Sequence, residues 1–176
     1  MIVLDVSGIK SSSGGKERFE RKVEMQPIRT GVETLYFEGP VMLDVVLFNN
    51  GGPLTMTGSL RGDIRLACGR CLEYFEMPVE AEISEVYYSQ SMPEIKPGEG
   101  EEWIPFRGDR IDITPEVIKS LLSSLPMKIV CREDCRGLCQ ICGANLNVLT
   151  CDCEKDNIDI RLESLRKLLE VKREKE

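Results

Sequence analysis

Apolar and polar residues alternate along much of the first half of the chain. The clearest runs are Ile2, Leu4 and Val6, then Leu54 and Met56, then Ile64 and Leu66, and then Val79, Ala81 and Ile83. A repeat of two residues is typical of strands with one buried face, so the pattern predicts a β-rich body. Gly58 and Gly62 fall inside one of these strands and predict a bulge or bend in it.

Helical spacing follows in the second half of the chain. Thr114 and Pro115 predict a helix start, because a hydroxyl can cap the first turn and a proline there needs no N–H group. The apolar face of this helix would consist of Val117, Ile118, Leu121, Leu122 and Leu125, and Pro126 would end it. A second amphipathic helix is predicted near the carboxyl end by the spacing of Ile158, Leu162, Leu165 and Leu169.

Between residues 90 and 109 the periodicity fades. Prolines, glycines and glutamates accumulate there, which predicts a loop or short linker. Trp103 and Phe106 are the residues expected to fix its far end.

Cysteine supplies the candidate chemistry, since the chain has eight cysteines and no histidine. Six of them lie between Cys131 and Cys153 with the spacing C-x3-C-x3-C-x2-C-x8-C-x-C, and a separate C-x2-C is formed by Cys68 and Cys71. Two cysteines separated by two residues can bind one tetrahedral zinc ion, whose sulfur ligands lie about 2.3 Å away. Gly143 supports this interpretation, because a residue free to adopt positive φ lets the backbone turn behind Cys142. The pattern predicts one or two zinc ions, with an iron–sulfur cluster or metal-free thiols as alternatives.

The division of the ligands among ions stays open in the sequence. Cys139 and Cys142 form the best half-site, and three pairs could complete it: Cys131 and Cys135, Cys151 and Cys153, or Cys68 and Cys71. Cys151 and Cys153 would face the same way in an extended segment, so they can share an ion. For Cys68 and Cys71, which should lie near a hairpin turn, a redox pair acidified by Arg70 is the rival hypothesis.

These patterns together predict the fold class and the domains. We expect an α+β protein in which an antiparallel β-rich body, barrel-like or a meander, carries two helices and a zinc-binding C-terminal segment. Residues 1–110 would form the β-rich body with the C-x2-C hairpin and an acidic loop. Residues 111–176 would hold the first helix, the cysteine-rich segment and the C-terminal amphipathic helix.

Composition and missing motifs argue against catalysis. Without histidine, the commonest general base and the serine–histidine triads are absent, and the chain has no P-loop or G-x-G-x-x-G element. The formal net charge is −7, and thiolates around zinc would make it more negative. Such a body is repelled by nucleic acid, so any RNA contact should be local or made through a partner protein.

The amino end shows no secretory signal pattern, and no stretch reaches the roughly 20 apolar residues of a membrane-spanning helix. We therefore expect a cytoplasmic protein, with no membrane and no small-molecule substrate among its partners. Thiols stay reduced in the cytoplasm, where dense cysteine more often indicates metal than disulfides.

Several motifs resemble one known family. The run D-C-R-G-L-C-x-x-C-G-A-N-L-N, the C-D-C that follows it and the ending IDIRLESL, together with CGRC at 68–71, are similar to the bacterial YceD family of large ribosomal RNA subunit accumulation proteins. The resemblance is clear over residues 111–169 and thin elsewhere. It implies a role in the synthesis, processing or stability of large-subunit ribosomal RNA during ribosome assembly, and it implies no catalytic activity.

Combining both lines, we expect a non-enzymatic factor in which structural zinc shapes a docking surface. Arg132, Arg136 and Arg70 are the candidate contacts to a large-subunit precursor, to a ribosomal protein or to an exposed RNA loop. A general zinc-stabilised interaction module and a C-x2-C thiol redox protein are the alternative hypotheses.

Overall fold

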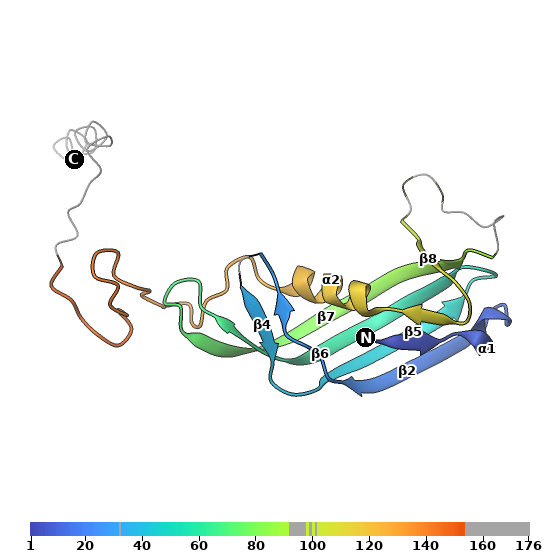
Figure 1. Cartoon of the computed structure of the whole chain (residues 1–176), viewed down its shortest axis with the longest axis horizontal. Helices are drawn as coiled ribbons and strands as arrows, with labels where there is room; N and C mark the ends of the chain where they lie inside the picture. The colour runs from blue at the N-terminus through green and yellow to red at the C-terminus, as the bar shows by residue number, and fades with distance from the viewer. Residues whose placement is uncertain (32, 92–97, 99, 101, 154–176) are drawn as a thin grey trace, which may run out of the picture. The chain divides into compact units, whose positions relative to one another are not determined.

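The computed structural model of the chain describes residues 1–31, 33–91, 98, 100 and 102–153. Contacts divide the chain into two compact units, one of residues 1–69 and 73–133 and one of residues 70–72 and 134–176. The regular elements, all in the first unit and drawn in Figure 1, are β1 (Val3–Asp5), α1 (Ser7–Lys10), β2 (Lys16–Val23), β3 (Ile28–Arg29), β4 (Thr34–Phe37), β5 (Val41–Asn49), β6 (Leu54–Ala67), β7 (Tyr74–Ser89), β8 (Ile104–Phe106), β9 (Arg110–Asp112) and α2 (Thr114–Ser124).

A mostly antiparallel sheet organises the first unit. Its strand order is β2-β5-β6-β4-β3, and β7 pairs with β6 and, in parallel, with β8. Both β5 and β4 pair with β6, at different positions along its length, and β7 pairs with β6 from end to end. Among the described residues no pairing joins β2 to β8, so the sheet is not a closed barrel.

The predicted alternation of buried and exposed residues is confirmed in the central strands. In β5, Val41, Leu43, Val45 and Leu47 are fully buried while the residues between them are partly exposed. Leu54, Met56, Ile64 and Leu66 of β6 are buried in the same core. The sequence between β6 and β7 is a tight connection that carries Cys68 and Cys71, as the pattern predicted. Burial of one face therefore sets the register of the sheet.

A bulge or bend was predicted at Gly58 and Gly62, and the bulge is absent. The pairing of β6 with β7 runs through both glycines, and that with β5 runs through Gly58, without an extra residue. Their role is close packing: a Cβ at Gly58 would lie 2.1 Å from the backbone oxygen of Asp44, and one at Gly62 would lie 2.7 Å from Cγ1 of Val41. Only glycine leaves room for the neighbouring strand at these positions.

Helix α2 confirms the predicted apolar face. Val117 and Leu121 are buried in the sheet core, and Ile118, Leu122 and Leu125 are partly buried. The hydroxyl cap was wrong, however, because Ile113 is the N-cap residue and makes no side-chain capping bond. Instead, Oδ1 of Asp112 accepts the Thr114 N–H at 3.0 Å, and Oγ1 of Thr114 accepts the Ile2 N–H at 2.6 Å.

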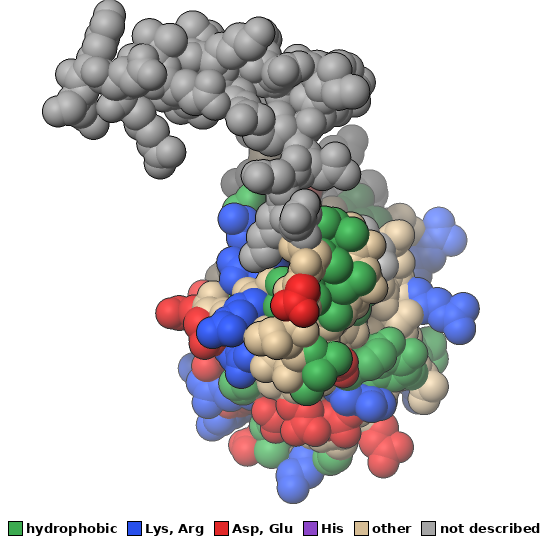
Figure 2. Space-filling model, turned by 90° about the vertical axis from the view of Figure 1, so that its left-hand side faces the viewer, with side chains coloured by type: hydrophobic (Ala, Val, Ile, Leu, Met, Phe, Trp, Pro, Cys, Tyr) green, Lys and Arg blue, Asp and Glu red, His purple; other side chains and the backbone are tan. Residues whose placement is uncertain are grey.

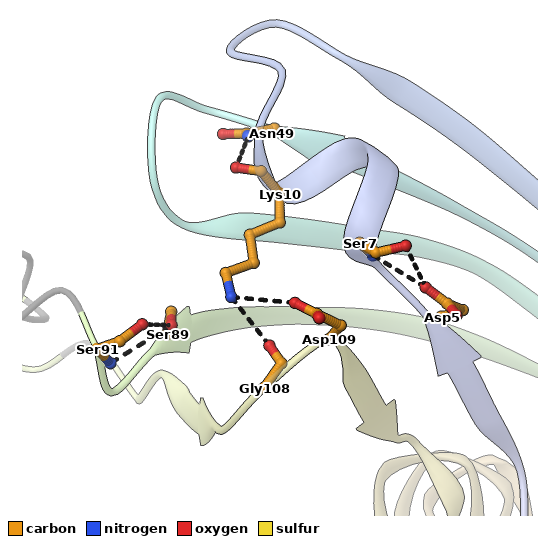
Figure 3. A network of polar contacts seen from close by, with 8 residues as sticks. All are labelled: Asp5, Ser7, Lys10, Asn49, Ser89, Ser91, Gly108 and Asp109. Carbon is orange, nitrogen blue, oxygen red and sulfur yellow. Dashed lines mark hydrogen bonds and ion pairs between the residues drawn. The ribbon is translucent and has the colours of Figure 1, made fainter.

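The amino end is held by polar contacts that Figure 3 shows. Nζ of Lys10 donates to the backbone oxygen of Gly108 at 3.1 Å and forms an ion pair with Oδ1 of Asp109 at 3.2 Å. The buried amide of Asn49 donates to the backbone oxygen of Lys10 at 3.2 Å. These bonds connect α1 to β5 and to the turn that precedes β9.

The linker predicted over residues 90–109 contains a strand. Ile104–Phe106 forms β8 at the end of β7, and the rings of Tyr88 and Trp103 lie 6.4 Å apart. Phe106 is buried, so both predicted aromatic residues do fix the far end of this segment. The predicted helix at Ile158–Leu169 lies outside the described residues. The division at residue 110 stays a prediction, whereas contacts group α2 with the strands.

Candidate metal centre

The eight cysteines form two groups of four free thiols. One group is Cys139, Cys142, Cys151 and Cys153, and the other is Cys68, Cys71, Cys131 and Cys135. Within each group the sulfur atoms all lie within 4.8 Å of one another. Four sulfurs bound to one zinc ion at about 2.3 Å lie about 3.8 Å apart, at the corners of a tetrahedron. Both groups therefore fit a site for one ion with four sulfur ligands.

This grouping selects among the pairs that the sequence left open. The half-site of Cys139 and Cys142 is joined by Cys151 and Cys153, the pair whose spacing allowed a shared ion. The C-x2-C of Cys68 and Cys71 is joined by Cys131 and Cys135. A single four-sulfur site within residues 131–153 would leave the other four thiols without a metal. The observed grouping instead places all eight cysteines in two sets of four, which favours two ions.

A tight turn forms the half-site of Cys139 and Cys142. The Cys139 N–H donates to the Ala144 backbone oxygen at 2.8 Å, and the Gly143 N–H donates back to the Cys139 oxygen at 2.9 Å. Gly143 has a φ of 73°, the positive value predicted from its place after Cys142. An isolated bridge pairs Leu138 with Asn145 across the same turn. The chain thus folds back over five residues and brings both sulfurs to one side.

The thiols of this group have unequal proton affinities. The backbone N–H groups of Cys142 and Ile141 point at the Cys139 sulfur and lower the pKa of that thiol to about 6. Contact with the thiol of Cys142 raises the pKa of Cys153 to about 12, because a thiolate there would face other sulfurs. A cation removes this repulsion, since metal ligands of this kind are thiolates.

Cys135 lies in a network of asparagines that the sequence interpretation missed. Nδ2 of Asn147 donates to Sγ of Cys135 at 3.3 Å, and Oδ1 of Asn147 accepts the Arg136 N–H at 2.8 Å. Oδ1 of Asn145 in turn accepts both the backbone N–H and the side-chain amide of Asn147, at 3.0 and 2.9 Å. Such outer partners orient the ligands of metal sites. The signal was present in the A-N-L-N run, whose asparagines lie three and five residues after Cys142.

Cys68 and Cys131, which belong to the same group as Cys135, are also held by backbone contacts. The Cys68 N–H donates to the Glu73 oxygen at 2.9 Å and closes the hairpin, while the Cys131 N–H donates to Sγ of Cys68 at 3.4 Å. Leu72, directly after Cys71, has a φ of 61°, which is uncommon for a residue with a side chain. Cys68, Cys71 and Cys135 are buried and Cys131 is half-buried, whereas Cys142 of the first group is exposed.

The three arginines proposed as contacts differ in their surroundings. Nη1 of Arg70 donates to the Cys135 backbone oxygen at 3.0 Å, and the Arg70 oxygen accepts the Leu138 N–H at 3.1 Å. Arg70 thus supports the backbone beside a cysteine. Arg132 and Arg136 are exposed. Their role in binding a partner stays a prediction.

The surface shows no single-sign field on the face drawn in Figure 2, where Lys and Arg side chains lie among Asp and Glu. Exposed ion pairs such as Arg61 with Glu80, at 2.6 Å, account for part of this mixture. Within the described residues, no helix is long and apolar enough to cross a membrane.

Comparison with known proteins places these features in a family. The chain is 28% identical over 164 residues to the chloroplastic large ribosomal RNA subunit accumulation protein YCED homolog 1 of Arabidopsis thaliana, an alignment that covers 78% of this chain and 51% of that protein. It is 27% identical over 147 residues to the Zea mays protein of the same name, with 68% of this chain and 50% of that protein covered. The uncharacterised protein YlbN of Bacillus subtilis is 30% identical over 112 residues, 63% of each chain.

The chain spans about half the length of the two plant relatives it matches, and no solved structure matches it. The sequence profile described as large ribosomal RNA subunit accumulation protein YceD matches residues 56–169, which include α2 and all eight cysteines, and the chain therefore belongs to the YceD family.

Proposed function

We propose that this protein is a non-enzymatic factor that promotes the accumulation of large-subunit ribosomal RNA during ribosome assembly. The observation that carries the proposal is the family match over residues 56–169. The plant relatives are named for this role, which is the source of the RNA and ribosomal partners proposed here. A location in the cytoplasm is part of the proposal, since free thiols persist in a reducing compartment.

Zinc is the proposed metal, with one ion in each group of four cysteines. Four sulfurs and no nitrogen or carboxylate ligands suit zinc, and a closed shell of four thiolates leaves no open position at which water could be activated. This supports a structural role. The association of Cys68 and Cys71 with Cys131 and Cys135 also favours a metal site over an isolated redox pair.

Paired substitutions test the two sites separately. Cys139→Ser with Cys142→Ser should lower the zinc content by one equivalent, and Cys68→Ser with Cys71→Ser should lower it by one equivalent as well. Metal analysis of protein purified without added zinc provides the measurement. If either pair of substitutions removed all the zinc or none of it, the assignment of one ion to each group would be wrong.

The acidic composition bears on how the RNA is reached. At a net charge of −7 the body lacks the excess of lysine and arginine that drives binding to RNA phosphates. We propose that contact with the precursor is made mainly through a ribosomal protein, with Arg132 and Arg136 as local contacts. Exchange of both for glutamate should reduce co-sedimentation with immature large subunits without loss of zinc, and unchanged co-sedimentation would contradict their role.

Depletion of the protein from cells tests the function itself. The expected result is a lower ratio of large to small subunits in a sedimentation profile, with restoration by the wild-type gene. The alternative, a zinc-stabilised interaction module without a ribosomal role, predicts an unchanged profile. That outcome would overturn the proposed function and leave the metal sites standing.

A further inference from the structure

One long edge of β7 has no strand partner among the described residues. β7 pairs with β6 along its whole length, but β8 pairs only with Tyr87, Tyr88 and Ser89. Residues 76–86 of β7 therefore leave a row of backbone N–H and C=O groups beside no described strand. Such an edge is a template on which another extended chain can pair.

Hydrogen bonds of β6 show which groups of β7 face this edge. The backbone oxygen of Asp63 accepts the Glu38 N–H at 2.9 Å, on the side of β6 away from β7. Pro78, the partner of Asp63 on β7, therefore also turns its backbone away from β6, and it has no N–H to donate there. Because backbone groups alternate in direction along an antiparallel pair, Glu80, Glu82 and Ser84 present their N–H and C=O groups at the open edge.

A groove runs beside this edge. Its volume is about 590 Å³, and it is lined by Glu80 and Glu82 of β7 and by Lys119, Ser120, Ser123 and Ser124 of α2. This volume is within the range of protein binding sites, and the serine hydroxyls offer both donors and acceptors. We refer to the open edge of β7 and this groove together as the slot.

The charge along the slot is acidic. β7 carries Glu76, Glu80, Glu82 and Glu85, of which Glu80 forms an ion pair with Arg61 of β6 at 2.6 Å. Lys119 is the cation that lines the groove, and it lies 3.4 Å from the carboxylate of Glu85. A negative slot repels RNA phosphate and attracts lysine and arginine side chains.

We propose that the open edge of β7 accepts an extended, lysine- and arginine-rich protein segment as an added β-strand. Main-chain hydrogen bonds to Glu80, Glu82 and Ser84 would supply the pairing, and the glutamates would select for basic side chains. The inference rests on the proposed function for the source of the segment, because proteins that bind ribosomal RNA carry the lysines and arginines that neutralise its phosphates.

A synthetic peptide tests the pairing directly. The probe is a labelled peptide of about ten residues in which Lys alternates with Val or Thr, and its control carries N-methyl groups on alternate residues, which keep the charge and remove the strand-pairing N–H groups. Fluorescence anisotropy with the full chain should show binding of the first peptide and at least about tenfold weaker binding of the second. Equal binding of the two peptides, or no binding of either, would overturn the proposal.

Substitutions on β7 provide the matched test. Ser84→Pro removes one N–H from the open edge and leaves the pairing with β6 intact, as Pro78 already does, so it should weaken peptide binding about tenfold, whereas Ser84→Ala should not. Glu80→Gln with Glu82→Gln should weaken binding and reduce its salt dependence. A Ser84→Pro variant that binds like Ser84→Ala would indicate charge attraction without strand addition and contradict the proposal.

Hydrogen exchange covers the case in which Ser84→Pro does not fold. In the wild-type full chain the amides of Glu80, Glu82 and Ser84 should exchange rapidly and become protected on addition of the peptide. Slow exchange before addition would mean that another part of the chain already occupies the edge, which would overturn the proposal. If the peptide does not bind by strand pairing but depletion still lowers the ratio of large to small subunits, this inference alone is contradicted. If the peptide binds as expected but depletion leaves that ratio unchanged, only the proposed function is contradicted.

Discussion

The side-chain amide of Asn147 donates a hydrogen bond to Sγ of Cys135 across 3.3 Å. The same asparagine accepts the N–H of Arg136, so it links the sulfur to the backbone of the next residue. A donor at a thiolate disperses its charge and fixes its direction, which makes Asn147 part of the proposed metal site although it is no ligand.

Replacement of Asn147 should therefore weaken metal binding. We expect Asn147→Ala to raise the rate of zinc loss to a chelator by about tenfold, the lower end of the effect found for outer partners of metal ligands. The control is Asn50→Ala, since the side-chain amide of Asn50 donates to the Thr55 hydroxyl on an exposed turn. Equal rates for the two variants would show that the bond to Cys135 has no role in holding the metal.

The environment of Tyr87 leads to a prediction about how the stability of the fold depends on pH. Its side chain is fully buried, and within the described residues its hydroxyl has no hydrogen-bond partner. Burial, followed by the nearby carboxylate of Glu116, raises the pKa of Tyr87 in the folded protein. A folded pKa above the unfolded value of about 10 means that stability is complete at neutral pH and falls as pH rises beyond about 10, where the unfolded phenol ionises.

Tyr87→Phe should remove this dependence. Since the hydroxyl is unpaired, we expect the free energy of unfolding at pH 7 to change by less than about 1 kcal/mol. Urea unfolding at about pH 7 and at about pH 10.5 should show a smaller loss of stability for the variant than for the wild type. A large loss at neutral pH would mean instead that the hydroxyl makes a bond in the folded protein.

The alternation of apolar and polar residues predicted the strands well, because the apolar or polar character of each strand residue indicates whether it is buried. The alternation at Leu54, Met56, Ile64 and Leu66 required no knowledge of partners, and these residues are buried as predicted. The turn at Gly143 was also local. The division of the cysteines was not, since Cys131 and Cys68 are 63 positions apart and only the fold shows that they meet. Spacing alone could not distinguish the three candidate pairs.

The predictions of a bulge at the glycines of β6 and of a hydroxyl cap at the start of α2 were wrong for a common reason. Gly58 is required by the backbone of the adjacent strand, a contact that no local pattern records. At the helix start, the Thr114 hydroxyl that was predicted to cap the first turn accepts the N–H of the distant Ile2 instead, while Asp112 accepts the N–H of Thr114. The contacts of Gly58 with Asp44 and of Thr114 with Ile2 join residues remote in the sequence, and they overrode the local preference.

Substitution of Gly58 tests the packing explanation. Gly58→Ala should lower the free energy of unfolding by more than about 2 kcal/mol, because the new Cβ would meet the Asp44 oxygen and the strands would have to separate. Gly8→Ala is the control, since a Cβ there has no neighbour within 4 Å, and its effect should be small or stabilising. Similar effects for both variants, measured by urea unfolding, would argue against a packing role.

The central claim is that each of the two thiol groups holds one zinc ion that stabilises the fold. Native mass spectrometry of the full chain, purified without added metal, tests it most directly, with circular dichroism of the same sample before and after chelation. We predict the mass of the chain plus two zinc ions, and a loss of ordered structure when the metal is removed. A folded chain that carries no metal and is unaffected by the chelator would contradict the account.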